Sequence, residues 1–231
     1  MFKALNKALR PKMKPGMGPI SHEKGTTFRV WAPNAQKVFV TGDFNDWNDT
    51  ANPLTHEGDG YWATDVARAK PGQEYKFVLV NGQDKLYRID PYARQVTNSV
   101  GNSVIHDPEF DWQGAEEFHN PPWNELIIYE VHIGTFNPPS ESRVGTFKRA
   151  AQKLPYLRDL GVNRVQVMPP MEVPGGRSWG YNLSLPFAVE SDYGGPKAFK
   201  EFIRAAHKNG IAVILDVVYN HLGPSDLDLW R

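Results

Sequence analysis

Cysteine is absent from the 231 residues, which excludes a disulfide framework, a thiolate metal site and a cysteine nucleophile. No apolar run is long enough to span a bilayer. An excess of charge is also missing, because 26 basic residues balance 26 acidic ones. Nucleic-acid-binding proteins normally carry a basic excess. We therefore expect a soluble globular protein that binds neither nucleic acid nor membranes.

The beginning of the chain lacks the continuous apolar stretch of a secretory signal, so we expect a cytoplasmic protein. Its first 14 residues contain five basic side chains and no acidic one. A basic segment with proline and glycine is typical of a solvated chain end. The sequence thus predicts a flexible basic tail over residues 1–25.

Short strands separated by turn residues follow from Thr26 to about Ile105. Polar and apolar residues alternate in several of them, and we expect Trp31, Trp62 and Phe77 to lie in a core. Asn81-Gly82 predicts a hairpin with positive φ at both turn positions. Strands at this spacing predict a β-sandwich of the immunoglobulin type over residues 26–105.

The pattern changes at about residue 125, after a proline-containing linker over 106–124. Pro155 should kink or divide the first of two helical windows, and Pro196 begins the second. The order strand, helix, strand, helix, strand predicts an α/β region with a parallel sheet over 125–231. Its expected strands are 126–133, 164–168 and 211–215, and its expected helices are 147–157 and 196–208.

Polar side chains lie at the ends of these strands, where α/β barrels carry their reacting groups. They include Glu172 after the second strand and the segment 216–221 after the third. The long connection over 169–195 is more typical of a functional loop than of a simple link. For three residues of the first strand we favour interior packing over ligand contact, namely Tyr129, Glu130 and His132.

These motifs resemble those of the α-amylase superfamily, glycoside hydrolase family 13. Residues 216–221 (Asp-Val-Val-Tyr-Asn-His) resemble its strand-three signature, and residues 128–136 resemble its first barrel strand. Residues 179–182 (Trp-Gly-Tyr-Asn), followed by 192–195, resemble the substrate loop of glucan branching enzymes and trehalose-releasing relatives. The sandwich resembles the family 48 carbohydrate-binding module in the segments 28–33, 42–47 and 90–93.

The resemblance implies a β-sandwich followed by the first three βα units of a TIM (β/α)8 barrel, truncated after the third strand. It implies that Tyr181 stacks on the glucose unit at the cleavage point and that His221 hydrogen-bonds its hydroxyls. Asp216 would organise the site rather than attack. The implied partner is an α-glucan such as glycogen, starch or a maltooligosaccharide.

Further roles follow from the resemblance alone. Trp47 and Lys76 match positions that hold glucan chains in related modules, although Trp47 could instead pack on the barrel. Residues 83–85 (Gln-Asp-Lys) stand where a second aromatic side chain is expected. Asn220 matches a calcium ligand of many amylases, but branching-type members generally manage without calcium. We therefore expect no cofactor.

A retaining glycosidase needs two carboxyl groups about 5–5.5 Å apart. In this family they come from strands four and five, so we expect no catalytic residue among these 231 and no turnover by this chain alone. Glu172 and Asp216 could lie near each other, but nothing would supply the surroundings of a substitute pair. We also expect an unpaired sheet edge to make the C-terminal half unstable or prone to aggregation.

The leading interpretation is an N-terminal fragment of an enzyme of carbohydrate metabolism similar to 1,4-α-glucan branching enzyme. Hydrolysis by an α-amylase, an isoamylase-type enzyme or a trehalohydrolase is the alternative. A non-catalytic glucan-binding protein is the alternative from another class, and a truncated gene product without function is a third.

Overall fold

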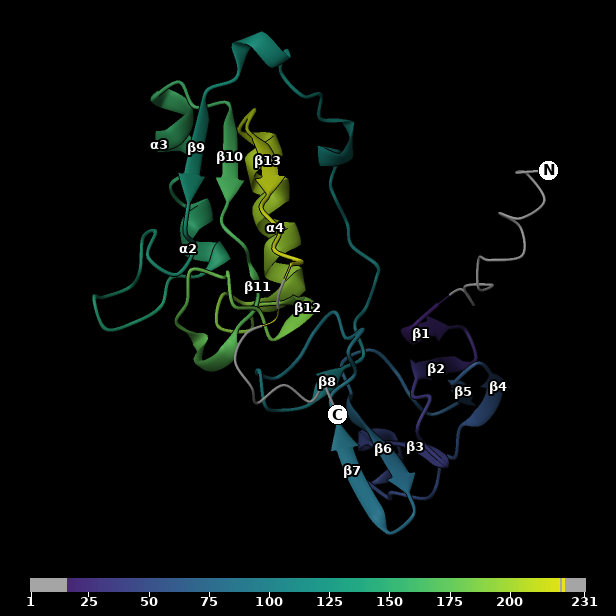
Figure 1. Cartoon of the computed structure of the whole chain (residues 1–231). Coiled ribbons are helices and arrows are strands. Elements are labelled where there is room, and N and C mark those ends of the chain that lie inside the picture. The colour runs from purple at the N-terminus through teal and green to yellow at the C-terminus, as the bar shows by residue number, and fades with distance from the viewer. Residues whose placement is uncertain (1–15, 221, 223–231) are drawn as a thin grey trace, which may run out of the picture.

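The computed structural model describes residues 16–220 and residue 222, and its first part is a sandwich of two antiparallel sheets (Figure 1). One sheet has the strand order β1-β2-β5-β4, and the other has the order β3-β6-β7 with β8 paired to β6. The strands are β1 (Gly18–His22), β2 (Gly25–Trp31), β3 (Lys37–Gly42), β4 (Thr55–Gly58), β5 (Tyr61–Val66), β6 (Glu74–Asn81), β7 (Asp84–Arg88) and β8 (Ser103–Val104).

Inward-facing residues of both sheets form the sandwich core, as alternation in the strands predicts. Phe77 is fully buried and Trp62 is nearly so. The expectation for Trp31 was wrong, because its side chain is 54% exposed. Trp31 directly follows the buried Val30, and successive side chains of a strand point to opposite faces.

Two local features differ from the sequence-based expectations. Strand β1 pairs with β2 inside the range 1–25, so the sandwich begins before residue 26. In the β6–β7 hairpin, Asn81 pairs with Asp84, and the turn is therefore Gly82-Gln83 rather than Asn81-Gly82. Of these turn residues only Gly82 has a positive φ, as in turns with glycine at the first central position.

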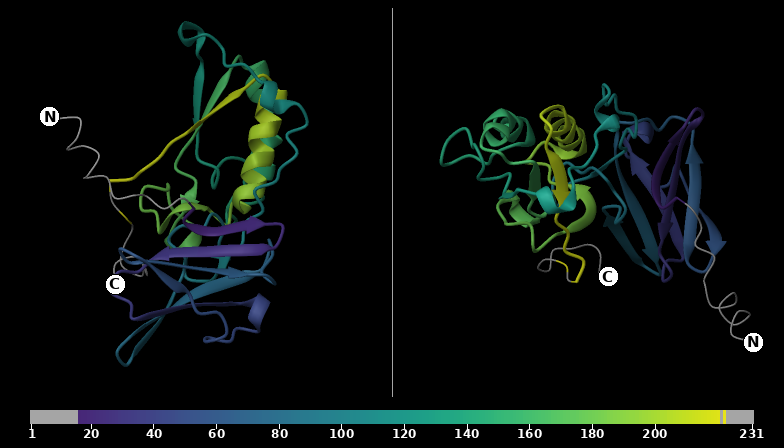
Figure 2. Two further views of the ribbon diagram at one scale, coloured as in Figure 1. Left: turned by 90° about the vertical axis from the view of Figure 1, so that its right-hand side faces the viewer. Right: turned by 90° about the horizontal axis from the view of Figure 1, so that it is seen from above.

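The second part contains a parallel sheet in the order β13-β10-β9. Helices α2 and α4 cover one face of this sheet (Figure 2), where a common core includes Val165, Phe147 and Phe202. Pro155 divides the first helical window, as predicted. The elements are β9 (Ile128–Val131), α2 (Phe147–Ala151), α3 (Leu154–Asp159), β10 (Arg164–Val167), β11 (Met171–Glu172), β12 (Leu185–Val189), α4 (Gly195–Lys208) and β13 (Ala212–Leu215).

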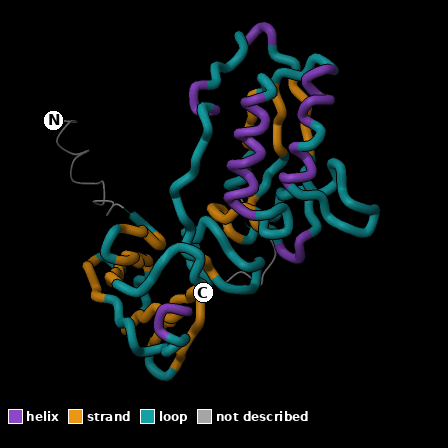
Figure 3. Tube along the Cα trace, turned by 180° about the vertical axis from the view of Figure 1, so that it is seen from behind, coloured by secondary structure: helices purple, strands orange, loops and turns teal. Residues whose placement is uncertain are grey.

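The segment 107–115, between sandwich and sheet, runs beside helix α4 (Figure 3). Lys200 and Arg204 donate hydrogen bonds to main-chain carbonyls of this segment, and both cations lie over the ring of Phe110. Cations over an aromatic face are attracted by its quadrupole. This segment, which we call the strap, is therefore held along the helix rather than loose.

Within the described residues, no helix is both long enough and apolar enough to cross a membrane.

Candidate functional site

The ends of the parallel strands bring Tyr181 and Asp216 together. Asp216 directly follows β13, and its backbone N–H donates to the carbonyl of Val167 at the end of β10. The Tyr181 hydroxyl, from the loop between β11 and β12, donates to Asp216 Oδ2 at 3.1 Å. Tyr181 remains 39% exposed, so its ring is accessible to a ligand.

The Tyr181 hydroxyl lies in a negative environment. Partial burial raises the pKa of Tyr181 above its usual value, and so do the hydrogen bond to Asp216 and the charges of Asp216 and Glu130. The hydroxyl therefore keeps its proton at neutral pH and acts as a donor. This geometry orients an aromatic ring and a carboxylate next to each other, as a sugar site requires.

The loop that carries Tyr181 is shaped by its neighbours in sequence. The Ser178 hydroxyl bonds the Asn182 side chain and accepts the backbone N–H of Gly180 at 3.1 Å. Gly180 has a φ of 94°, and a Cβ there would overlap the carbonyl of Pro169. Only glycine allows this close approach of the backbone.

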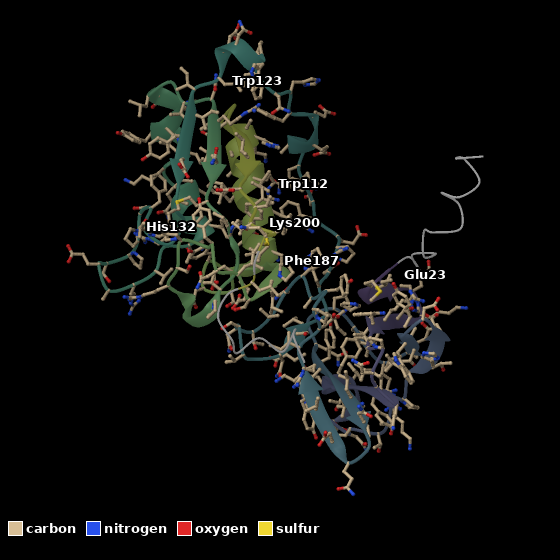
Figure 4. All side chains as sticks on the ribbon, viewed as in Figure 1. Glu23, Trp112, Trp123, His132, Phe187 and Lys200 are labelled. Carbon is tan, nitrogen blue, oxygen red and sulfur yellow. The ribbon has the colours of Figure 1, made fainter. Side chains whose placement is uncertain are left out.

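His132, which directly follows β9, contacts the same loop. Its Nε2 lies 2.8 Å from the Ser178 carbonyl and 2.9 Å from the Tyr193 hydroxyl, and its Nδ1 lies 3.0 Å from the Thr135 hydroxyl. Because a carbonyl only accepts hydrogen bonds, Nε2 must carry the proton. His132 is thus a satisfied side chain that supports the Tyr181 loop, and Figure 4 labels it within the βα part.

Two buried glutamates lie at the β11–β12 pair. Glu172 in β11 accepts the Ser191 backbone N–H at 2.8 Å, and Glu190 accepts the N–H of Val173 at 2.9 Å. Burial raises the pKa of Glu172 to about 8, with the Glu190 charge as the next cause, and burial also raises the pKa of Glu190. Burial thus favours the protonated form of Glu172 at neutral pH.

Sequence reasoning singled out Glu172 and placed Glu190 in the long connection over 169–195, but it did not pair the two residues. Glu172 bonds Ser191, while Asp216 bonds Tyr181, so the structure gives these two carboxylates different partners. The sequence pattern that could have pointed to Glu190 is the short apolar run 185–189 directly before it. This run forms strand β12 in the structure. His221 lies outside the described residues.

In the sandwich, the Trp47 turn is anchored beside β6. Trp47 Nε1 donates to one oxygen of Asp43, and the Glu74 backbone N–H donates to the other. The indole is 37% exposed. Lys76 alternates with the buried Phe77 and therefore faces outward from the same strand.

Asn220 is exposed at the end of the described segment. Among the residues that the structure describes, no group of three or more His, Cys, Asp or Glu side chains could hold a metal ion. The presence or absence of calcium stays a prediction.

The two parts match two family models. Residues 16–93 match carbohydrate-binding module 48, the isoamylase N-terminal domain, and residues 128–227 match the α-amylase catalytic domain. The chain combines a family 48 module with part of an α-amylase catalytic domain. The resemblance to the α-amylase superfamily is thereby confirmed.

Curated proteins similar to this module and catalytic part include a malto-oligosyltrehalose trehalohydrolase of Saccharolobus solfataricus. It is 39% identical over 203 residues, which cover 87% of this chain and 34% of that protein. The 1,4-α-glucan branching enzyme GlgB of Oceanobacillus iheyensis is 34% identical over 217 residues, covering 90% of this chain and 34% of the enzyme. The chain spans about a third of the length of these relatives.

A solved structure of a putative α-amylase from Salmonella typhimurium is 38% identical and superposes with a TM-score of 0.81. The match covers 92% of this chain and 35% of that one. A pullulanase from Paenibacillus barengoltzii, at 24% identity and a TM-score of 0.70, supports the fold alone.

Proposed function

We propose that this chain is the N-terminal part of an α-glucan-active enzyme that transfers or hydrolyses glycosidic bonds with retention. The observation that carries the proposal is the hydrogen bond from Tyr181 to Asp216 at the ends of the parallel strands. Tyr181 would stack on a glucose ring, Asp216 would hold the Tyr181 hydroxyl, and His221 would hydrogen-bond sugar hydroxyls. We further propose that the parallel sheet is the beginning of a (β/α)8 barrel.

The most specific activity that we propose is that of a 1,4-α-glucan branching enzyme, in which a glucan segment passes through a covalent glycosyl-enzyme to a new acceptor. Similarity to GlgB proteins supports it. Similarity to trehalohydrolases supports hydrolysis as the second candidate. The nucleophile and the acid/base would come from strands four and five, so the 231 residues alone should bind glucan without converting it.

In the module, we propose that Trp47 and Lys76 hold a glucan chain on the outer face of the β3-β6-β7 sheet. An exposed indole, fixed by Asp43, offers a flat ring to the apolar face of a sugar. The outward ammonium of Lys76 can donate to sugar oxygens. Cytoplasmic localisation and the absence of a cofactor stay predictions.

Affinity electrophoresis in gels containing glycogen tests binding. The 231-residue chain should be retarded, and Trp47→Ala should reduce the retardation. Trp123→Ala is the matched control, because Trp123 is exposed at the end of the molecule far from the sandwich (Figure 4). Equal mobility of all three proteins with and without glycogen would refute glucan binding by the module.

Reducing-sugar and iodine-staining assays test conversion. We expect no signal from the purified 231-residue chain with starch or glycogen. Turnover that persists through purification, and that is lost in Asp216→Asn, would show that these residues suffice for catalysis and would overturn this part of the proposal.

A further inference from the structure

A groove with a volume of about 700 Å³ lies where the sandwich meets strand β12. This volume is within the range of about 300–1,000 Å³ that is usual for ligand sites. Its walls come from the end of β2 and the following loop, from β6 and β7, from residues 91–92, and from Pro186 and Phe187 in β12. Figure 4 labels Phe187 close to the junction of the two parts.

The groove is separate from the surface that carries Trp47 and Lys76. Phe77 and Leu79 of β6 line it, and these residues alternate along the strand with Lys76. Side chains that alternate in a strand point to opposite faces. The groove therefore opens on the other face of the β3-β6-β7 sheet, and neither Trp47 nor Lys76 lines it.

Aromatic rings that are accessible to a ligand line the groove. Trp31 is 54% exposed and Phe187 is 49% exposed. Phe187 stacks on Tyr92 with ring centroids 5.4 Å apart and an angle of 10° between the planes, so this ring pair joins the sandwich to β12. The Trp31 indole is fixed, because its Nε1 donates to the carbonyl of Asp59 at 3.1 Å.

The charge of the lining favours an uncharged ligand. Among the described residues that line the groove, Arg88 is the only charged one, and Asn34 and Asn81 supply amide donors and acceptors. Flat rings with a few amides suit the alternating apolar and hydroxyl faces of a sugar chain. Rings that are held in place before binding also lower the entropic cost of binding.

We propose that this groove is a second α-glucan site, in which an oligosaccharide stacks on Trp31 and on the Tyr92–Phe187 pair. The proposal rests on the proposed function, because it assigns the same class of ligand to a different face of the module. A chain bound there would pass from the sandwich onto the connection between β11 and α4, which also carries Tyr181.

Fluorine NMR of the 231-residue chain labelled with 5-fluorotryptophan tests the proposal. The seven tryptophans give separate probes, and Trp→Phe variants assign the signals of Trp31, Trp47 and Trp123. During titration with maltoheptaose, we expect the Trp31 and Trp47 signals to shift with separate affinities and the Trp123 signal to stay. Cellohexaose, with β-linkages, is the control ligand.

Two variants separate the sites. Phe187→Ala removes an exposed ring, and we expect the affinity reported by Trp31 to fall about five- to tenfold while that reported by Trp47 is unchanged. Trp47→Ala should leave the Trp31 titration unchanged.

A Trp47 shift without a Trp31 shift would overturn the second site and leave the proposed function standing. Absence of both shifts would overturn both. If the Trp31 signal changed on dilution of the protein without sugar, the groove would be a contact between copies of the chain and the proposal would be wrong.

Discussion

The buried glutamate pair makes the loop between β11 and α4 sensitive to pH. A pKa of about 8 for Glu172, against 4.5 in an exposed glutamate, means that the folded chain binds this proton more tightly than the unfolded one. The contribution of Glu172 to stability is therefore complete below pH 4.5 and is lost as the pH rises through about 8. Since one pKa unit corresponds to about 1.4 kcal/mol, the whole loss is on the order of 5 kcal/mol.

Glu172→Gln replaces the protonated carboxyl with a neutral group of similar shape whose carbonyl can still accept the Ser191 N–H. We expect the variant to match the wild type at pH 5 and to be the more stable of the two at pH 8. Hydrogen exchange of peptides spanning residues 171–193 measures this directly. At each pH the two proteins have the same chemical exchange rate, so their difference reports the opening free energy alone.

Glu141→Gln, at an exposed position, is the control and should show no pH-dependent difference. If Glu172→Gln exchanged faster than the wild type at pH 8, Glu172 would be ionised in the fold and stabilised by the Ser191 donors. The reasoning from burial would then be wrong.

Three further substitutions have defined outcomes. Gly180→Ala forces a side chain onto the Pro169 carbonyl at a positive φ, so we expect a cost of about 1–3 kcal/mol and faster tryptic cleavage of this loop. Tyr75→Phe removes the 2.6 Å hydrogen bond to the buried Asp90, so we expect the free energy of unfolding of the sandwich in urea to fall by about 1–3 kcal/mol. An unchanged free energy of unfolding would contradict this expectation. Phe110→Ala removes the ring that contacts Lys200 and Arg204. We expect the opening free energy of the strap, measured by hydrogen exchange of its backbone amides, to fall by about 1 kcal/mol.

Several elements were predictable because local chemistry determines them. Pro155 lacks a backbone N–H and so divides α2 from α3, and Pro196 stands in the first turn of α4. Polar and apolar residues alternate in β10, and β13 is an apolar run of strand length, so both patterns indicate strands without further context.

Other elements depend on contacts that sequence patterns do not show. The β11–β12 pair is short, and Pro186 inside β12 argues against a strand by its own propensity. Trp31 is a large apolar residue of the kind found in cores, but its position in β2 directs its side chain to the face opposite that of the buried Val30. For the candidate site, Tyr181 and Asp216 were predictable from the motifs, whereas Glu190 and the support from His132 require distant segments to be placed side by side.

The strap has a consequence for how the two parts move. Its carbonyls and the Phe110 ring are bound along α4, a helix packed on the same sheet whose strand end bears Asp216. The connection from the sandwich to the parallel sheet is therefore a bound segment and not a free tether. A cut after residue 115 that separates the two halves would leave the cations of α4 without these acceptors, whereas a cut before residue 107 would keep them.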